Sequence, residues 1–377
     1  MNLRRTLRAL RYGSYILHKR NRPPFYLIHF VTERCTANCR HCFLDRERSE
    51  HTGLELTIDE IGTIARKLKR LLFVFLTGGE PFLREDLPEI AQVYHRDAGV
   101  QKIQCPTNGS LPDEAVRFAR IVAGSCPDLH VSITVSFDAV GGKHDASRRT
   151  QGLFERTVET FKRLKEEEKK WPNFNVNATT TVSAFNQNDL DEVYRFVRET
   201  LGCQNYFNTL VRGMPRDPAT REVDIGLFER FNDRLERGLR EEGMRGYQRF
   251  AFAEFINAKN LISRRMIAEV ARSGAYQTPC FAGQIAGVMY SGGDIHPCEL
   301  IDRPFGNIRD FEYDLGALWK SAEAEGIRRF IKNSRCVCTH ECFTTLNILF
   351  NCRFLPRLIG ETFRLKAGRK RRSRVSP

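Results

Sequence analysis

A short apolar segment followed by a loop and a helical segment recurs six times between residues 25 and 211. The segments expected to be strands cover residues 25–31, 71–76, 101–105, 130–137, 174–182 and 205–211. Continuous or alternating apolar strands joined through helices are typical of a parallel α/β sheet. Loops that follow such strands meet at one edge of the sheet, where active sites form. Six units are too few to close an eightfold barrel.

Three cysteines follow the first of these strands in one loop, at Cys35, Cys39 and Cys42. Three thiolates can hold three irons of a cubane cluster and leave the fourth iron open. A cluster with four cysteine ligands mostly transfers electrons, whereas an open metal position can bind a substrate or cofactor. Taken alone, the loop also fits a zinc knuckle or three buried thiols.

The second strand ends in Gly78-Gly79-Glu80-Pro81. Two glycines let the backbone approach a ligand closely, and the adjacent carboxylate can accept hydrogen bonds from an ammonium group. Polar residues also close the third and fourth strands, at Asn108, Ser136 and Asp138. Each of these residues also fits an ordinary turn or cap.

The CxxxCxxC loop and the GGEP segment together resemble the signature of the radical SAM enzymes. The resemblance implies a partial (β/α)6 TIM-like barrel with a catalytic [4Fe-4S] cluster on Cys35, Cys39 and Cys42. In that family the open iron chelates S-adenosylmethionine, and an electron cleaves it to a 5′-deoxyadenosyl radical that abstracts hydrogen from a substrate. The cofactor-binding residues implied here are His41, Gly78, Gly79, Glu80, Pro81, Asn108, Ser136 and Asp138. Arg148 and Arg149 are weaker candidates for a clamp on the cofactor carboxylate.

A second cysteine-rich segment begins at Cys280. Cys280, Gly293 and Cys298 resemble the opening of the SPASM or twitch extension, which holds auxiliary iron–sulfur clusters. The later run departs from that pattern, because it reads CxCxxxC. The resemblance therefore implies one auxiliary [4Fe-4S] cluster, for which we expect as ligands Cys280, Cys298 and two of the group Cys336, Cys338 and Cys342. A structural zinc site has similar ligand needs.

The net charge of +14 lies at the two ends of the chain, since residues 1–24 and 364–377 each hold seven Lys or Arg and no acid. Residues 3–17 place leucines near one helical face among arginines, a pattern that fits an anionic membrane surface or docking on the protein body. No secretory signal or membrane span is visible, which predicts a cytoplasmic protein, peripheral to the inner membrane face at most. Of the four cysteines outside both groups, Cys352 is a spare thiol, and Cys105, Cys126 and Cys203 are expected in the core.

These patterns predict a basic amphipathic segment (1–24), a radical SAM core (25–220), a helical bridge (221–275), a SPASM/twitch-like domain (276–355) and a basic, disordered tail (356–377). The expected activity is hydrogen abstraction from a peptide or small molecule, with an electron donor such as flavodoxin or ferredoxin. One alternative is radical modification of a lipid or lipid-linked sugar at a membrane. The other is a non-catalytic metal-binding protein that contacts nucleic acid, against which the GGEP segment argues.

Overall fold

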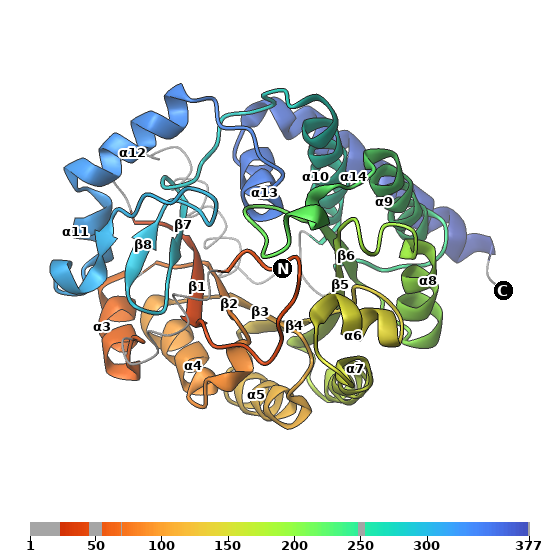
Figure 1. The fold of residues 1–377 in the computed structure, drawn as a ribbon, viewed down its shortest axis with the longest axis horizontal. Helices are drawn as coiled ribbons and strands as arrows, with labels where there is room; N and C mark the ends of the chain where they lie inside the picture. Colours follow the sequence, from red (N-terminus) through yellow and green to blue (C-terminus); the bar gives the residue numbers. More distant parts are fainter. Residues whose placement is uncertain (1–22, 45–54, 69, 248–252, 376–377) are drawn as a thin grey trace.

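The computed structural model describes residues 23–44, 55–68, 70–247 and 253–375, with side chains described up to residue 368. The basic helix expected within residues 3–17 lies outside these ranges. Figure 1 shows a curved sheet with helices outside it and a second group of helices across its open side. No helix in the described part of the chain is both long and apolar enough to cross a membrane.

Nine strands form one sheet in the order β6-β5-β4-β3-β2-β1-β7-β8-β9. The first six strands pair in parallel and are β1 (Tyr26–Thr32), β2 (Phe73–Gly78), β3 (Lys102–Thr107), β4 (His130–Ser136), β5 (Phe174–Val182) and β6 (Tyr206–Leu210). Each lies within a few residues of the segment expected from the sequence, and the open arrangement confirms the predicted α/β partial barrel. Strand β4 is buried along nearly its whole length, as its continuous apolar pattern indicates.

The outer layer consists of the helices that connect these strands (Figure 1). They are α3 (Ile58–Leu68), α4 (Leu87–Ala98), α5 (Pro112–Ser125), α6 (Gly142–Arg148), α7 (Leu153–Lys170) and α8 (Leu190–Arg195). Helix α3 starts with a capping box, because the Thr57 amide donates to Glu60 Oε2 at 2.8 Å and the Glu60 amide donates to Thr57 Oγ1 at 3.3 Å.

Four more helices lie beyond β6 and across the open side of the sheet: α9 (Ile225–Arg240), α10 (Ala253–Ser273), α13 (Glu341–Leu349) and α14 (Leu355–Val375). Helix α14 corrects one expectation, since the basic tail is helical over the described residues and not disordered. Leu358 and Leu365 of α14 are almost fully buried, against residues of α10. Burial of these leucines stabilises the helix, although the high charge of the segment suggests disorder.

The cysteine-rich segment continues the sheet. Strand β7 (Ala286–Met289) pairs in parallel with β1, and β8 (Asp294–His296) and β9 (Gly306–Asn307) follow it in antiparallel pairings. Helices α11 (Leu315–Trp319) and α12 (Ala322–Asn333) cover this end of the sheet. The cysteines that follow Cys280 are thereby held beside the partial barrel by shared backbone hydrogen bonds.

Candidate functional site

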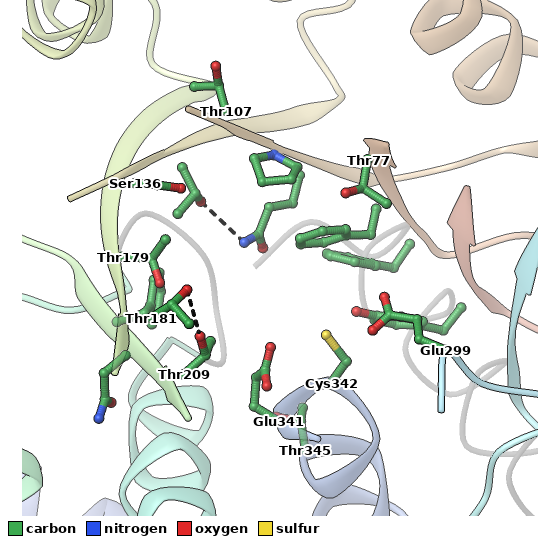
Figure 2. A pocket seen from close by; sticks show the side chains of 18 of the residues that line it. Thr77, Thr107, Ser136, Thr179, Thr181, Thr209, Glu299, Glu341, Cys342 and Thr345 are labelled. Carbon is green, nitrogen blue, oxygen red and sulfur yellow. Dashed lines mark hydrogen bonds between the residues drawn. The ribbon is translucent and has the colours of Figure 1, made fainter. Parts of the chain in front are cut away.

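A cavity of about 1220 Å³ lies between the sheet and the helices α10 and α13. Aromatic and aliphatic side chains form much of its wall, and a set of hydroxyl groups from successive strands interrupts it. Figure 2 shows side chains that carry such hydroxyls at the cavity, from Thr77, Ser136, Thr179, Thr181 and Thr209, whereas the Thr107 hydroxyl points away from it. Since these five come from β2, β4, β5 and β6, the parallel order of the sheet brings them together.

The cysteine loop forms one end of this cavity, which Cys35, Cys39 and Cys42 all line. The loop is held from one side by the carboxyl end of α6, where the Asn38 amide donates to the Arg148 carbonyl at 3.1 Å. From the other side, the Arg216 amide donates to the Cys42 carbonyl at 2.9 Å. These contacts hold the loop through its backbone, so the three thiols line the same cavity and take no part in these hydrogen bonds.

The two glycines after β2 are required by the backbone of the cysteine loop. A Cβ on Gly79 would lie 2.2 Å from the Arg34 carbonyl oxygen, and one on Gly78 would lie 2.1 Å from the Thr32 carbonyl oxygen. The Gly79 amide donates to the Thr32 carbonyl at 3.0 Å. Both glycines line the cavity as well, so the close approach joins β2 to the cysteine loop at the cavity wall.

Glu80 lies behind this wall, where its side chain is fully buried. Its carboxylate accepts hydrogen bonds from the Thr107 hydroxyl at 2.9 Å and from the Asn108 amide at 2.8 Å. Burial raises the pKa of Glu80 to about 7, against the opposing effect of these donors. Asn108 in turn donates to Thr36 Oγ1 at 2.9 Å and lies 3.8 Å from Cys35 Sγ. Glu80 therefore orders the loop that contacts the thiols.

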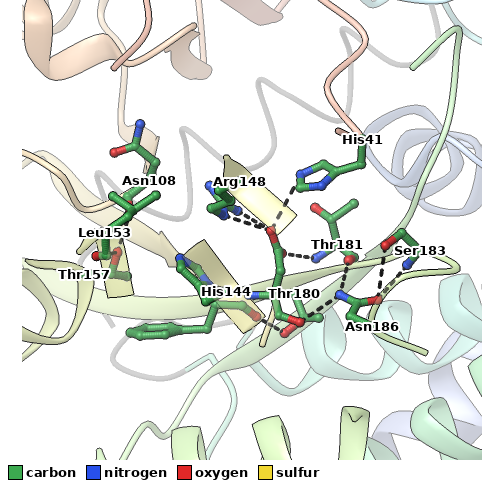
Figure 3. A network of polar contacts seen from close by, with 12 residues as sticks. His41, Asn108, His144, Arg148, Leu153, Thr157, Thr180, Thr181, Ser183 and Asn186 are labelled. Atoms are coloured by element: carbon green, nitrogen blue, oxygen red, sulfur yellow. Dashed lines mark hydrogen bonds and ion pairs between the residues drawn. The ribbon is translucent and has the colours of Figure 1, made fainter. Parts of the chain in front are cut away.

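Asp138 is the centre of a buried polar network at the end of β4 (Figure 3). Arg148 Nη2 lies 2.7 Å from Asp138 Oδ2, and His41 Nε2 lies 3.6 Å from the same oxygen. The Thr181 amide donates to Asp138 Oδ1 at 2.9 Å. Asp138 is fully buried, whereas Arg148 and His41 line the cavity. In this geometry, Arg148 is the charged group at the cavity wall, and the buried Asp138 is its ion-pair partner.

The structure thus places the predicted residues in two layers. The residues that line the cavity are Cys35, His41, Cys39, Cys42, Gly78, Gly79, Asn108 and Ser136, while Glu80, Pro81 and Asp138 lie behind them. The donor set fits a cluster and a zwitterionic cofactor, because three thiols are free of disulfides and His41 Nδ1 is buried without a partner. The sequence favours Asp138 over Arg148 as a cofactor contact, but it is Arg148 that lines the cavity. Nothing in the spacing shows which of the two faces it.

The later cysteines divide into two groups. The thiols of Cys336 and Cys338 are hydrogen-bonded to each other. Cys338 raises the pKa of both Cys280 and Cys298, and these two in turn act to raise the pKa of Cys336. Burial raises the pKa of Cys280 to about 11 and that of Cys298 to about 12. Cys342 belongs elsewhere, because its thiol contacts Tyr26 and lines the cavity. Figure 2 shows it directed into that space.

An ion-paired group that sequence reasoning did not predict lies beside Cys342. Arg212 bridges two carboxylates, at 3.1 Å from Glu299 and 2.9 Å from Glu341. His340 Nε2 lies 2.8 Å from Glu299. Burial by itself would raise the pKa of Glu299, but His340 and Arg212 lower it to about 2. Both carboxylates on this side of the cavity therefore share Arg212 as their charged partner.

The three cations Lys102, Lys259 and Arg264 were also missed. They line the cavity at the opposite end from the cysteine loop, near the first residues of β3 and β6. Lys259 and Arg264 lie on α10, whose path across the sheet no local pattern fixes. The same face of α10 also lines the cavity through Ile256, Asn260, Ser263 and Ile267. Its mixture of apolar and polar residues does not indicate from sequence that this face is turned toward the sheet.

An open α/β barrel with three free thiols beside a large cavity defines an enzyme with a metal-cluster cofactor. Residues 30–197, just under half of the chain, match the Radical SAM superfamily. The chain therefore contains a radical SAM domain and is an S-adenosylmethionine-dependent enzyme, and the family implies a [4Fe-4S] cluster and S-adenosylmethionine as cofactors.

Known proteins of two kinds resemble it along most of its length. An AdoMet-dependent heme synthase from Methanosarcina barkeri is 27% identical over 303 residues, which are 78% of this chain and 81% of that protein. Streptococcus suis SuiB bound to precursor peptide SuiA superposes with a TM-score of 0.60 at 17% identity, over 87% of this chain and 72% of that one. Native anSMEcpe with bound AdoMet and a peptide superposes with a TM-score of 0.56 at 15% identity, over 92% of this chain and 100% of that one.

Proposed function

We propose that this enzyme abstracts hydrogen from a peptide or small-molecule substrate held in the cavity between the sheet and α10. The observation that carries the proposal is that one cavity is lined by the three thiols and by most of the residues expected to contact the cofactor, and has room beyond them. With a volume of about 1220 Å³, it exceeds the ordinary upper range for a small-molecule site, about 1,000 Å³.

The chain's own residues then have distinct tasks. Cys35, Cys39 and Cys42 hold the cluster, and Arg148 binds the cofactor carboxylate while Asp138 orients it. When bound, the cluster and S-adenosylmethionine supply the 5′-deoxyadenosyl radical. The apolar wall keeps water away from the reacting atoms. Support for a peptide comes from the bound peptides of SuiB and anSMEcpe, and support for a small molecule comes from the name of the heme synthase.

An auxiliary [4Fe-4S] cluster belongs to the same proposal. Its proposed ligands are Cys280, Cys298, Cys336 and Cys338, since these four thiols influence one another and Cys342 does not share their surroundings. Four thiolates suit a cluster that transfers electrons. A zinc ion held by the same thiolates is the outcome to be excluded.

The test measures iron, sulfide, zinc and released 5′-deoxyadenosine on anaerobically reconstituted protein with a strong reductant. We expect about eight irons per chain and deoxyadenosine that disappears in the C35A/C39A/C42A variant. The control is Cys352→Ala, which removes an exposed thiol outside both groups. About four irons with zinc bound would remove the auxiliary cluster, and a loaded enzyme that releases no deoxyadenosine would contradict the main proposal.

A second candidate, action on a lipid at an anionic membrane surface, is favoured by the outer face of α14. Leu355, Ile359 and Phe363 are 48%, 44% and 68% exposed and recur every fourth residue along the helix. The seven Lys or Arg of residues 364–377 lie directly beyond them. An apolar stripe beside a basic run fits the headgroup region of an anionic bilayer.

Co-sedimentation with vesicles tests this candidate. We expect binding to phosphatidylglycerol vesicles, little binding to phosphatidylcholine vesicles, and loss of binding in the L355Q/I359Q/F363Q variant. The N-terminal segment is tested separately by deleting residues 1–24. Equal binding by the triple variant would contradict the role of α14, and a fall in its oligomeric state would show that a second copy of the chain covers the stripe.

A further inference from the structure

Three side chains that bind metals in other proteins meet where α13 begins, on the consecutive residues His340, Glu341 and Cys342. One ring nitrogen of His340, a carboxylate oxygen of Glu341 and the sulfur of Cys342 all lie within 4.8 Å of one another. Glu341 and Cys342 line the cavity, and Figure 2 shows both at its wall. Imidazole, carboxylate and thiolate are the three kinds of donor that zinc takes in proteins.

The ring of His340 is held so that Nδ1 is the free donor atom. His340 is 1% exposed, and its Nε2 lies 2.8 Å from Glu299 Oε2. A neutral imidazole that donates its Nε2–H to a carboxylate has its free electron pair on Nδ1. Nδ1 lies 3.9 Å from Glu341 Oε2 and forms no hydrogen bond with any described residue. Buried nitrogen atoms without a partner are uncommon, so this one points to a ligand.

The other two donors are each held by a neighbouring side chain as well. Arg212 Nη1 donates to both oxygens of Glu341, at 3.1 and 2.9 Å. The thiol of Cys342 is hydrogen-bonded to the hydroxyl of Tyr26. Each carboxylate oxygen keeps a second lone pair after it accepts one hydrogen bond. Partners of this kind, like Glu299 beside His340, orient the ligands of metal ions in proteins.

Two protein cations act on the same group. Arg212 is the charged partner of both carboxylates, and Lys259 interacts with the thiol of Cys342. Burial and the neighbouring Lys102 lower the pKa of Lys259 to about 7, so this lysine can release its proton when a cation binds nearby. Burial raises the pKa of Cys342, and its thiol proton therefore leaves only when a metal ion takes its place.

We propose that His340 Nδ1, Glu341 and the Cys342 thiolate bind a divalent metal ion such as zinc at the wall of the cavity. Two ligand atoms of a zinc ion lie at most about 4.4 Å apart, so shifts of about 1 Å close the group around the ion. Three protein ligands leave a fourth position open, and here that position faces the cavity. An oxygen or nitrogen atom of the substrate binds there and is polarised. That last step rests on the proposed function, whereas the metal site itself does not.

Equilibrium dialysis against zinc, followed by elemental analysis, tests the site on anaerobically reconstituted enzyme, in which iron occupies the cluster cysteines. We expect about one zinc per chain beyond the iron. Glu299→Gln removes the orienting carboxylate and should weaken zinc binding about 10–100-fold, and His340→Gln and Cys342→Ala should weaken it further. The control is Cys352→Ala, which removes an exposed thiol and should leave zinc binding unchanged.

The absence of bound zinc, or equal binding by His340→Gln and Cys342→Ala, would overturn the inference. C280A/C298A should keep the zinc, and its loss there would assign the ion to the four-thiol group. A lower iron content in Cys342→Ala would make this thiol a cluster ligand and would also overturn the site. Melting temperatures show which variants fold, and where one does not, the other decides. Zinc is counted without turnover, so an enzyme that releases no deoxyadenosine would remove the proposed reaction and not this site.

Discussion

Gly79 shows at the residue scale how the GGEP segment and the cysteine loop depend on each other. Gly79→Ala places a methyl group 2.2 Å from the Arg34 carbonyl oxygen, so loop or strand must shift. We expect a loss of about 1–3 kcal/mol in the free energy of unfolding, and lower iron content after reconstitution. Both are measured by denaturant titration and iron analysis. Gly326→Ala, with open space around it in α12, should be neutral or stabilising; similar losses in both variants would contradict the close-approach argument.

The buried pair of Asp138 and Arg148 gives a second prediction at this scale. Asp138→Asn leaves the buried Arg148 guanidinium without its counter-charge, at a cost of about 3–5 kcal/mol. Adding Arg148→Met should recover part of that loss, because the unpaired charge is then gone. Urea unfolding of both single variants and the double variant measures the coupling. Strictly additive losses would show that the two residues act independently, and that Asp138 does not orient Arg148.

At the scale of elements, Glu60 links the start of α3 to the segment after β9. Arg309, the Thr57 amide and the Tyr313 hydroxyl together lower the pKa of Glu60 from 4.5 to about 2. A lowered carboxyl pKa adds stability that is complete above pH 4.5 and is lost as the pH falls toward 2. Glu60→Gln should therefore cost about 1–3 kcal/mol at pH 7 and almost nothing near pH 2.

Acid titration of the free energy of unfolding checks this sign. The matched control is Glu159→Gln, which breaks an exposed pair with Arg163 and should cost less than about 1 kcal/mol. A difference between wild type and Glu60→Gln that stays constant from pH 7 to pH 2 would mean that Glu60 contributes through packing and not through its charge.

The elements themselves were predictable to the extent that their signals are local. Strand positions follow from apolar runs, and the first loop and the GGEP segment follow from spacing, so the cysteine end of the cavity was visible in the sequence. The opposite end was not, because Lys259 lies on α10 and faces the cavity only through the path of residues 221–275. The choice of Cys336 and Cys338 over Cys342 depends in the same way on where α13 starts.

At the scale of the whole molecule, α14 holds α10 in place, although the composition of α14 is that of a charged tail. The segment reads as a charged tail, yet Leu358 packs with Ile262 and Met266 of α10, and Leu365 packs with Ala258 and Leu261. Those α10 residues alternate with the ones that line the cavity. Helix α14 therefore supports the cavity from behind, through α10, which carries the lining residues Lys259 and Arg264.

Three leucine substitutions in α14 separate this supporting role from that of its exposed face. Leu358→Ala and Leu365→Ala each remove a side chain that is at most 2% exposed, and should cost about 2–5 kcal/mol in the free energy of unfolding. Because α10 loses its backing, both should also lower the release of 5′-deoxyadenosine by the reconstituted enzyme. Leu355→Ala removes the same atoms from a position that is 48% exposed and should change neither. Denaturant titration and deoxyadenosine release of the three variants measure this, and equal stability in all three would mean that α14 does not hold α10 in place.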